Sequence, residues 1–199
     1  MSEQPYDLVI RGASILDGSG SAPWTGDVAV RADRIVAVGD VKEGGARTLE
    51  GRGLAVAPGF IDVHSHDDFA VLLEPEMPFK LLQGVTTDVV GNCGLGAAPF
   101  RQAAATAAVL HPGRVLPAYE GYAGYLAALD REPASLNVAA LVGHGAIRVA
   151  AMEDPSKRSS PAERDRMREL LEEGLEAGAV GFSTGLIYEP GRCADEAEI

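Results

Sequence analysis

Two histidines, His64 and His66, stand two residues apart at the end of a mostly apolar run over residues 54–63. Such a run, bounded by glycines, is typical of a buried strand, along which alternate side chains point to the same face. The two imidazoles therefore share a face and could bind one metal ion. A lone histidine more often packs or bonds the backbone, but an aligned pair preceded by Asp62 favours a metal site. Asp62 either supports a ligand from behind or bonds the backbone.

A cysteine, Cys93, follows the second apolar run, residues 86–91, within the turn Gly91-Asn92-Cys93-Gly94. If the sheet is parallel, neighbouring strand ends lie roughly 5 Å apart, so the thiol would lie beside the histidines. A metal ion lowers the pKa of a nearby thiol enough to make it a ligand. The alternative is a buried structural cysteine. The adjacent histidine pair favours ligation, and the predicted metal ligands are His64, His66 and Cys93.

Two further polar residues follow the third and fourth predicted strands, residues 136–142 and 179–182. In parallel α/β folds the carboxyl ends of the strands form the active face. His144 there either contacts substrate or a metal ligand, or is a structural histidine between two glycines. Tyr188 either contacts substrate or packs in the wall of the site.

Short apolar runs alternate with helical stretches after residue 54, which predicts βα units around a parallel sheet. Helices are expected over residues 78–83, 119–129 and 161–177. The last has the clearest signals, because Ser160 and Glu163 form a capping box, Pro161 suits the first helical position and Gly178 ends it. Residues 97–118 are expected to form an insertion above the sheet, of the kind that serves as a binding loop or lid.

The first part of the chain predicts a small antiparallel β domain. Its β-branched runs cover residues 6–11, 13–16, 27–31 and 34–38. The turn at 32–33 has no glycine, so Asp33 is expected to take the left-handed conformation. The domains are therefore predicted as residues 1–53 and 54–199.

The composition of the 199 residues is that of a water-soluble protein, with 46% hydrophobic and 23% charged residues. No apolar run reaches the roughly 18 residues that span a bilayer, and the first residues show no secretory signal. A net charge of −12 opposes nonspecific binding to nucleic acid or anionic lipid. Only two cysteines are present, a hundred residues apart, which argues against a disulfide framework. We expect a cytoplasmic protein without nucleic-acid or membrane partners.

Four stretches together resemble the N-acyl-D-amino-acid deacylases (D-aminoacylases) of the amidohydrolase superfamily: residues 57–66, 91–94, 141–144 and 178–186. The resemblance implies a (β/α)₈ TIM barrel of the metal-dependent hydrolase type, with about four βα units in this chain, preceded by the small β domain. It also implies one or two zinc ions. Carried over by position, His64, His66 and Cys93 match metal ligands, while His144 and Tyr188 match pocket positions. The implied reaction is zinc-dependent hydrolysis of the amide bond of N-acyl-D-amino acids.

The cyclic amidohydrolases, such as dihydroorotases and hydantoinases, are the alternative. They would be expected to have a lysine, carboxylated as a bridging ligand, at the end of the fourth strand, where this chain has Ser183 and Thr184. The three lysines lie elsewhere, at Lys42, Lys80 and Lys157, which favours the deacylases.

The deacylase pattern also requires two more metal-binding histidines and a general-base aspartate, which we expect after residue 199. The chain thus resembles an N-terminal part, and residues 195–199 resemble the start of a helix. A complementing C-terminal half is a candidate partner, and a non-catalytic fragment is the remaining alternative. A partial barrel would expose strand edges and one side of its core. The 199 residues alone are expected to be inactive.

Overall fold

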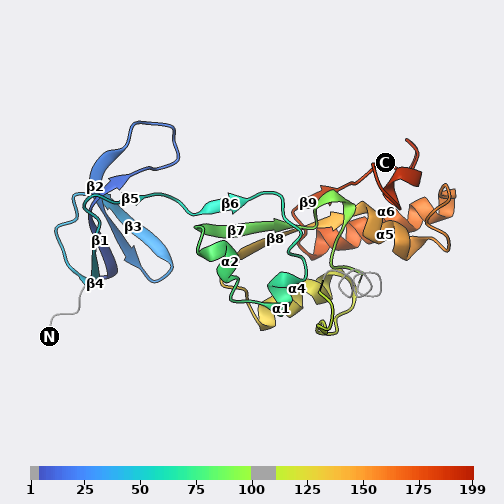
Figure 1. The fold of residues 1–199 in the computed structure, drawn as a ribbon, viewed down its shortest axis with the longest axis horizontal. Helices are drawn as coiled ribbons and strands as arrows, with labels where there is room; N and C mark the ends of the chain where they lie inside the picture. Colours follow the sequence, from blue (N-terminus) through green and yellow to red (C-terminus); the bar gives the residue numbers. More distant parts are fainter. Residues whose placement is uncertain (1–4, 100–110) are drawn as a thin grey trace. The chain divides into compact units, whose positions relative to one another are not determined.

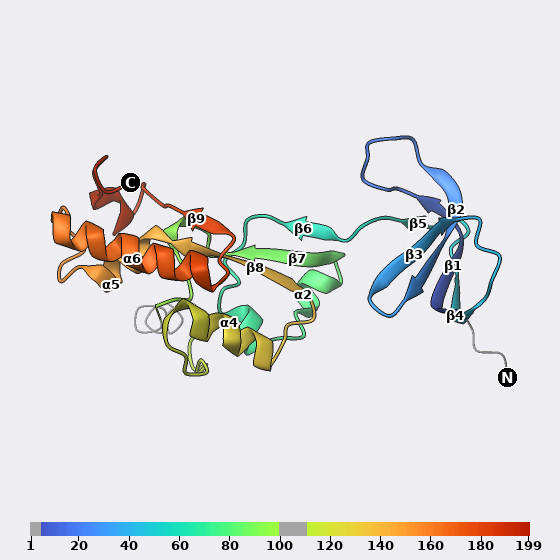
Figure 2. The ribbon, with the colours of Figure 1, turned by 180° about the vertical axis from the view of Figure 1, so that it is seen from behind.

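The computed structural model describes residues 5–99 and 111–199, which form two compact units, Met1–Pro58 and Gly59–Ile199 (Figures 1 and 2). The predicted domain boundaries at residues 53 and 54 stay a prediction. Half of the predicted insertion over residues 97–118 lies outside the described residues. Among the residues described, no helix combines the length and apolarity needed to cross a membrane.

The first unit is a five-stranded sheet in the order β3-β2-β1-β4, with β5 also paired to β1. The pairs β1/β2 and β2/β3 are antiparallel, as predicted, but β4 and β5 run parallel to β1. Strand β4 was not predicted, because an edge strand with almost every residue exposed carries no buried-face pattern. The predicted runs 6–11 and 13–16 form one strand whose register shifts around Gly12. The strands are β1 (Tyr6–Ile15), β2 (Trp24–Arg31), β3 (Arg34–Gly39), β4 (Gly45–Glu50) and β5 (Ala55–Val56).

In the turn between β2 and β3 the left-handed residue is Ala32, whereas the prediction was Asp33. Ala32 has a φ of 51°, and Asp33 is not among the described residues with positive φ. The carboxylate of Asp7 accepts a hydrogen bond from the Ala32 N–H at 2.6 Å. This bond to a side chain distant in sequence holds Ala32 in a conformation that alanine rarely adopts.

Asp27 of β2 fixes the irregular part of β1. Its carboxylate accepts hydrogen bonds from the Gly12 N–H and the Arg11 guanidinium, both at 2.8 Å, and from the Val41 N–H at 3.3 Å. The Gly12 bond lowers the pKa of Asp27 most, burial opposes it, and Arg11 and Val41 lower it further. The ionised carboxylate thus connects three segments of the first unit.

This environment predicts acid sensitivity of the first unit. A carboxyl whose pKa is depressed in the folded state contributes stability above its unfolded pKa and loses it as pH falls through the folded pKa. Urea unfolding followed by the fluorescence of Trp24, the single tryptophan, should therefore show stability falling below about pH 4. Asp27→Asn should have a lower free energy of unfolding than wild type at pH 7, and that free energy should change less with pH. Asp33→Asn, at a side chain 80% exposed, is the control, and parallel curves for wild type and Asp27→Asn would contradict the prediction.

The second unit contains a parallel sheet of four strands that are neighbours in chain order, β6-β7-β8-β9, as predicted. The strands are β6 (Phe60–Asp62), β7 (Val85–Val90), β8 (Asn137–Gly143) and β9 (Gly181–Ser183). The helices are α1 (Ala70–Leu73), α2 (Pro78–Leu81), α4 (Gly121–Arg131), α5 (His144–Ala151) and α6 (Pro161–Ala177), with 3₁₀ turns η1 (Asn92–Gly94) and η2 (Gly191–Cys193). Both views place α1, α2 and α4 on one side of the strands (Figures 1 and 2).

The main core lies between these strands and helices. It includes Val90 and Val142 of the sheet, Tyr125 of α4 and Met167 of α6. Other apolar side chains in or beside the sheet stay in solvent, among them Phe60 (66% exposed), Val63 (70%) and Val180 (63%).

The helix predicted over residues 161–177 is confirmed in its bounds, its capping box at Ser160 and Glu163, and its left-handed end at Gly178. Helix α5 was missed because it begins directly after a strand, with Gly143 at its N-cap and no capping side chain. Residues 195–199, expected to resemble the start of a helix, form a turn in which the Asp195 carbonyl accepts from the Glu198 and Ile199 N–H groups at 3.0 and 3.4 Å. The Asp195 carboxylate also accepts from the Ala197 N–H at 3.2 Å, and the expected helix stays a prediction.

The prediction of one strand over residues 54–63 is wrong. Residues 55–56 pair with β1, and residues 60–62 pair with β7, so the run belongs to two different sheets. Pro58, between them, has no N–H to donate to a ladder. At Gly59 a side chain would overlap Thr86, so only glycine permits this approach to β7.

Candidate metal centre

Three predicted ligands meet beyond the ends of β6 and β7. One ligand atom each of His64, His66 and Cys93 lie within 4.8 Å of one another. His64 Nε2 is 3.1 Å from Cys93 Sγ, and the two imidazole rings are edge to face with centroids 5.6 Å apart. Within the described part of the chain, no other group of three or more His, Cys, Asp or Glu side chains is placed to share an ion.

The donor set and its geometry fit a zinc ion. Zinc binds imidazole nitrogen at about 2.0–2.1 Å and thiolate sulfur at about 2.3 Å, so ligand atoms around one ion are separated by distances of the kind seen here. Both histidines are exposed and Cys93 is partly buried, which leaves the ion side of the group open to solvent. Two imidazoles and a thiolate suit zinc better than calcium or magnesium, which prefer oxygen ligands.

The histidine loop, residues 63–66, is held by hydrogen bonds rather than by strand pairing. Strand β6 ends at Asp62, so the strand alternation used in the prediction does not reach His64. The Asp62 carboxylate instead accepts the His64 N–H at 3.2 Å. The Ser65 N–H and hydroxyl both donate to the Val89 carbonyl, at 3.3 and 3.2 Å.

The bond that Asp62 makes to backbone involves a ligand candidate, His64, and its predicted support of the metal site stays a prediction. Its other oxygen accepts from Lys80 Nζ at 2.5 Å. This bond is the largest cause that lowers the pKa of Asp62, followed by the bond from the His64 N–H. Asp62 thus acts on the histidine loop while it remains ionised.

The cysteine loop, η1, has an unusual backbone. Gly91 and Gly94 are left-handed, with φ of 83° and 72°, and so is Cys93 itself, with φ of 58°. For a residue with a side chain this conformation costs about 1–2 kcal/mol. The Asn92 amide donates to the Val89 carbonyl at 2.8 Å, so the same oxygen that holds Ser65 also holds this turn.

Two hydroxyls hold η1, one from the last residue of β9 and one from the segment that follows it. Ser183 Oγ accepts from the Gly94 N–H at 3.0 Å and donates to the Gly91 carbonyl. The Tyr188 hydroxyl donates to the Cys93 carbonyl, and burial raises the pKa of Tyr188, so it stays a donor at neutral pH. The predicted substrate contact of Tyr188 stays a prediction. The sequence placed Ser183 at the rim of the site but did not reveal this bonding.

His144 lies in a different environment from the three ligand candidates. It is 2% exposed, and its Nε2 is 2.8 Å from Glu198 Oε1. Glu198 also accepts from Arg148 and, at 2.6 Å, from the Ser159 hydroxyl. Burial raises the pKa of Glu198, but these hydrogen bonds outweigh it and lower the pKa overall. This agrees with the structural alternative for His144, and its predicted substrate contact stays a prediction.

Asp68, two residues after His66, is a buried acid that the sequence analysis missed. Its side chain faces the core, where burial raises the pKa of Asp68 to about 7. The Tyr125 hydroxyl donates to its backbone carbonyl at 3.0 Å. Its position directly after the His-Ser-His-Asp run gave no sign of burial, because acidic residues are mostly exposed.

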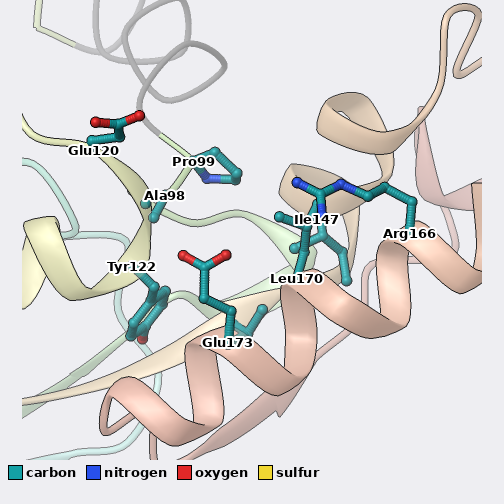
Figure 3. Close-up of a pocket in the computed structure, with 10 residues that line it drawn as sticks. Ala98, Pro99, Glu120, Tyr122, Ile147, Arg166, Leu170 and Glu173 are labelled. Atoms are coloured by element: carbon teal, nitrogen blue, oxygen red, sulfur yellow. The ribbon is translucent and has the colours of Figure 1, made fainter.

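A cavity of about 240 Å³ lies apart from the three ligand candidates, between α4 and α6. Figure 3 shows Glu173 and Arg166 of α6 on one side and Glu120, before α4, on the other. None of the three predicted metal ligands lines it. The open surface beside His64 and His66 is therefore the candidate site.

Comparison with known proteins identifies the family of the chain. The profile described as "Amidohydrolase family" matches residues 48–197. The chain belongs to the amidohydrolase family. It is 45% identical over 198 residues to the N-acyl-D-glutamate deacylase of Alcaligenes xylosoxydans xylosoxydans, covering 99% of this chain and 41% of that protein.

Two solved structures also match closely. N-acyl-D-glutamate deacylase from Bordetella bronchiseptica, complexed with zinc and a phosphonate inhibitor, superposes with a TM-score of 0.90 at 44% identity, covering 98% of this chain and 41% of the other. A D-aminoacylase studied for its binuclear metal centre has a TM-score of 0.90 at 38% identity and the same coverage. The chain thus spans about two fifths of the relatives that it matches.

Close packing around η1 leads to a testable prediction. A side chain at Gly185 would overlap the Cys93 carbonyl and the Tyr188 hydroxyl, so Gly185→Ala must displace η1. We expect a loss of about 1–3 kcal/mol of unfolding free energy. The control is Gly124→Ala in α4, where the new methyl meets Tyr119 at an ordinary 3.4 Å and helix propensity favours alanine. Urea unfolding followed by circular dichroism measures both, and equal stability of the two variants would contradict the packing argument.

Proposed function

We propose that the protein to which these residues belong is a metal-dependent hydrolase of N-acyl-D-amino acids. It cleaves the amide bond and yields a carboxylate and a free D-amino acid. The observation that supports it best is the convergence of His64, His66 and Cys93 within 4.8 Å, in a chain 45% identical to an N-acyl-D-glutamate deacylase.

We propose that the parallel sheet is part of a (β/α)₈ barrel. Four strands in chain order with helices on one side are the repeating unit of that fold. In such barrels the active site is formed at the carboxyl ends of the strands. His64, His66 and Cys93 follow the carboxyl ends of β6 and β7, which supports this assignment.

In the proposed site His64 and His66 would hold zinc as neutral imidazoles, and Cys93 would hold it as a thiolate after losing its proton. A zinc ion bound there would supply Lewis-acid chemistry, polarising the substrate carbonyl and making water more acidic. Ser183 and Tyr188 keep the Cys93 backbone in place, and Asp62 keeps the His64 backbone in place.

The three ligand candidates determine neither the number of metal ions nor the identity of the general base. One of the related structures is a D-aminoacylase with a binuclear metal centre, and we propose one or two zinc ions here. The resemblance assigns the base to an aspartate outside these 199 residues. We therefore expect this part of the protein to bind metal without completing turnover.

Zinc content tests the ligand set. After dialysis against buffer with trace zinc, Cys93→Ala should retain much less zinc per chain than wild type, because it loses the only thiolate near the imidazoles. Cys193→Ala should match wild type, since Cys193 lies in η2 and belongs to no described group of candidate ligands. Atomic emission measures both. Equal zinc in the two variants would remove Cys93 from the ligand set.

Product analysis tests the reaction. A longer protein that contains these residues, loaded with zinc, should release D-glutamate or D-aspartate from the N-acetyl compounds, with the N-acetyl-L compounds as controls. The 199 residues alone should release neither. Chiral chromatography detects the products. If the longer protein released no D-amino acid, the deacylase proposal would be overturned. If the 199 residues alone released one, the reaction would not require a general base outside them.

A further inference from the structure

Lys80 of α2 lies among three carboxylates behind the candidate metal centre. Its Nζ is 2.5 Å from Asp62 Oδ2, 2.8 Å from Asp67 Oδ2 and 3.5 Å from Asp88 Oδ1. The lysine side chain is 13% exposed and that of Asp88 is fully buried. The other two lysines, Lys42 and Lys157, form ion pairs in which the lysine is 76% exposed. Lys80 is therefore the one lysine held inside the protein.

The partners of Lys80 lie at both ends of the histidine loop. Asp62 ends β6 directly before the loop, and Asp67 follows His66 directly. One ammonium group therefore holds residues 62 and 67 close together. The same Asp62 carboxylate accepts the His64 N–H through its other oxygen, so the connection from Lys80 to the first ligand passes through a single side chain.

The third partner connects this group to the strand that leads to Cys93. Asp88 lies in β7, directly opposite Asp62 in the register of the two strands, and β7 continues into η1. Burial alone would lower the pKa of Lys80, but the hydrogen bonds from its ammonium to Asp62 and Asp67 outweigh this and raise it. The ammonium is thus charged and attracts carboxylates that would otherwise repel one another.

We propose that Lys80 is a positioning residue of the metal centre, which draws together the two ends of the histidine loop so that His64 and His66 can share an ion with Cys93. The inference rests on the proposed function, because it takes this group of side chains to bind metal. The described ion pairs of Lys80 are all with aspartates and none is with His64, His66 or Cys93, so its effect is transmitted through Asp62 and Asp67.

Two measurements on the purified chain test the proposal separately. The first is hydrogen exchange of the amides of residues 63–67 without metal, and the second is zinc affinity by competition with a chromophoric chelator. The variants are Lys80→Met, which keeps the length and apolar stem but removes the charge, and Lys80→Arg, which restores a cation. Lys42→Met removes an exposed lysine and is the matched control.

We expect Lys80→Met to accelerate exchange in residues 63–67 and to weaken zinc binding by about tenfold to a hundredfold, the usual effect of removing support behind metal ligands. Lys80→Arg should recover most of both properties, and Lys42→Met should equal wild type. A folded Lys80→Met with wild-type exchange and wild-type zinc affinity would overturn the inference. Loss of rescue by Lys80→Arg together with a general fall in stability would point to a merely structural lysine and would also overturn it.

Failure of the proposed function gives a different result. If wild type binds no zinc, the metal centre is refuted, while the exchange of residues 63–67 still decides whether Lys80 holds the loop. If Lys80→Met does not fold, Asp67→Asn replaces it, because that variant leaves Lys80 paired with Asp62 and Asp88. Faster exchange and weaker zinc binding in Asp67→Asn would support the inference, and wild-type values would overturn it.

Discussion

The backbone carbonyl of Val89 joins the two loops that carry the candidate ligands. It accepts from the Ser65 N–H and hydroxyl on the histidine side and from the Asn92 amide on the cysteine side. Asn92 also donates to the Ser65 carbonyl at 3.4 Å, so the loops are connected directly as well. The separation of 3.1 Å between His64 Nε2 and Cys93 Sγ depends on this junction, since neither loop belongs to a strand.

Support for each loop comes from a different part of the second unit. Lys80 acts on the histidine loop from the helical side of the sheet, through Asp62 and Asp67. Ser183 acts on the cysteine loop from the end of β9. The parallel pairing of the four strands brings the supported loops together, because the carboxyl ends of parallel strands lie at the same edge of the sheet. Residues more than a hundred positions apart therefore determine one local geometry.

The sequence predicted that His64, His66 and Cys93 lie together because the information for this grouping is local. A histidine pair after an apolar run, and a cysteine between glycines one unit later, specify ligand types and their approximate positions. Helix α6 was also predicted from local information, because its capping box and its terminating glycine lie at the two ends of one continuous stretch. The parallel sheet followed from the alternation of apolar runs and helices.

The errors arose where nonlocal contacts decide the outcome. The run 54–63 is continuous in hydrophobicity, yet its halves pair with different partners. Ala32 is left-handed because its N–H donates to the Asp7 carboxylate, a distant contact that turn statistics do not contain. The sequence indicates only that Lys80 does not lie at the end of the fourth strand, which says nothing about its ion pairs. Its partners, Asp62 and Asp67, lie more than ten residues before it, and nothing in the sequence shows that they meet.

The left-handed backbone at Cys93 shows how stability and chemistry compete at this site. Glycine would relieve the conformation, and glycine is found at both neighbouring left-handed positions, 91 and 94. A side chain in this conformation persists only where its surroundings hold it, and here Ser183, Tyr188 and Asn92 all bond the turn. Strain at the position of a thiol that points at an imidazole is the pattern expected when side-chain chemistry outweighs backbone preference. The hydroxyls of Ser183 and Tyr188 are therefore part of what makes Cys93 available as a ligand.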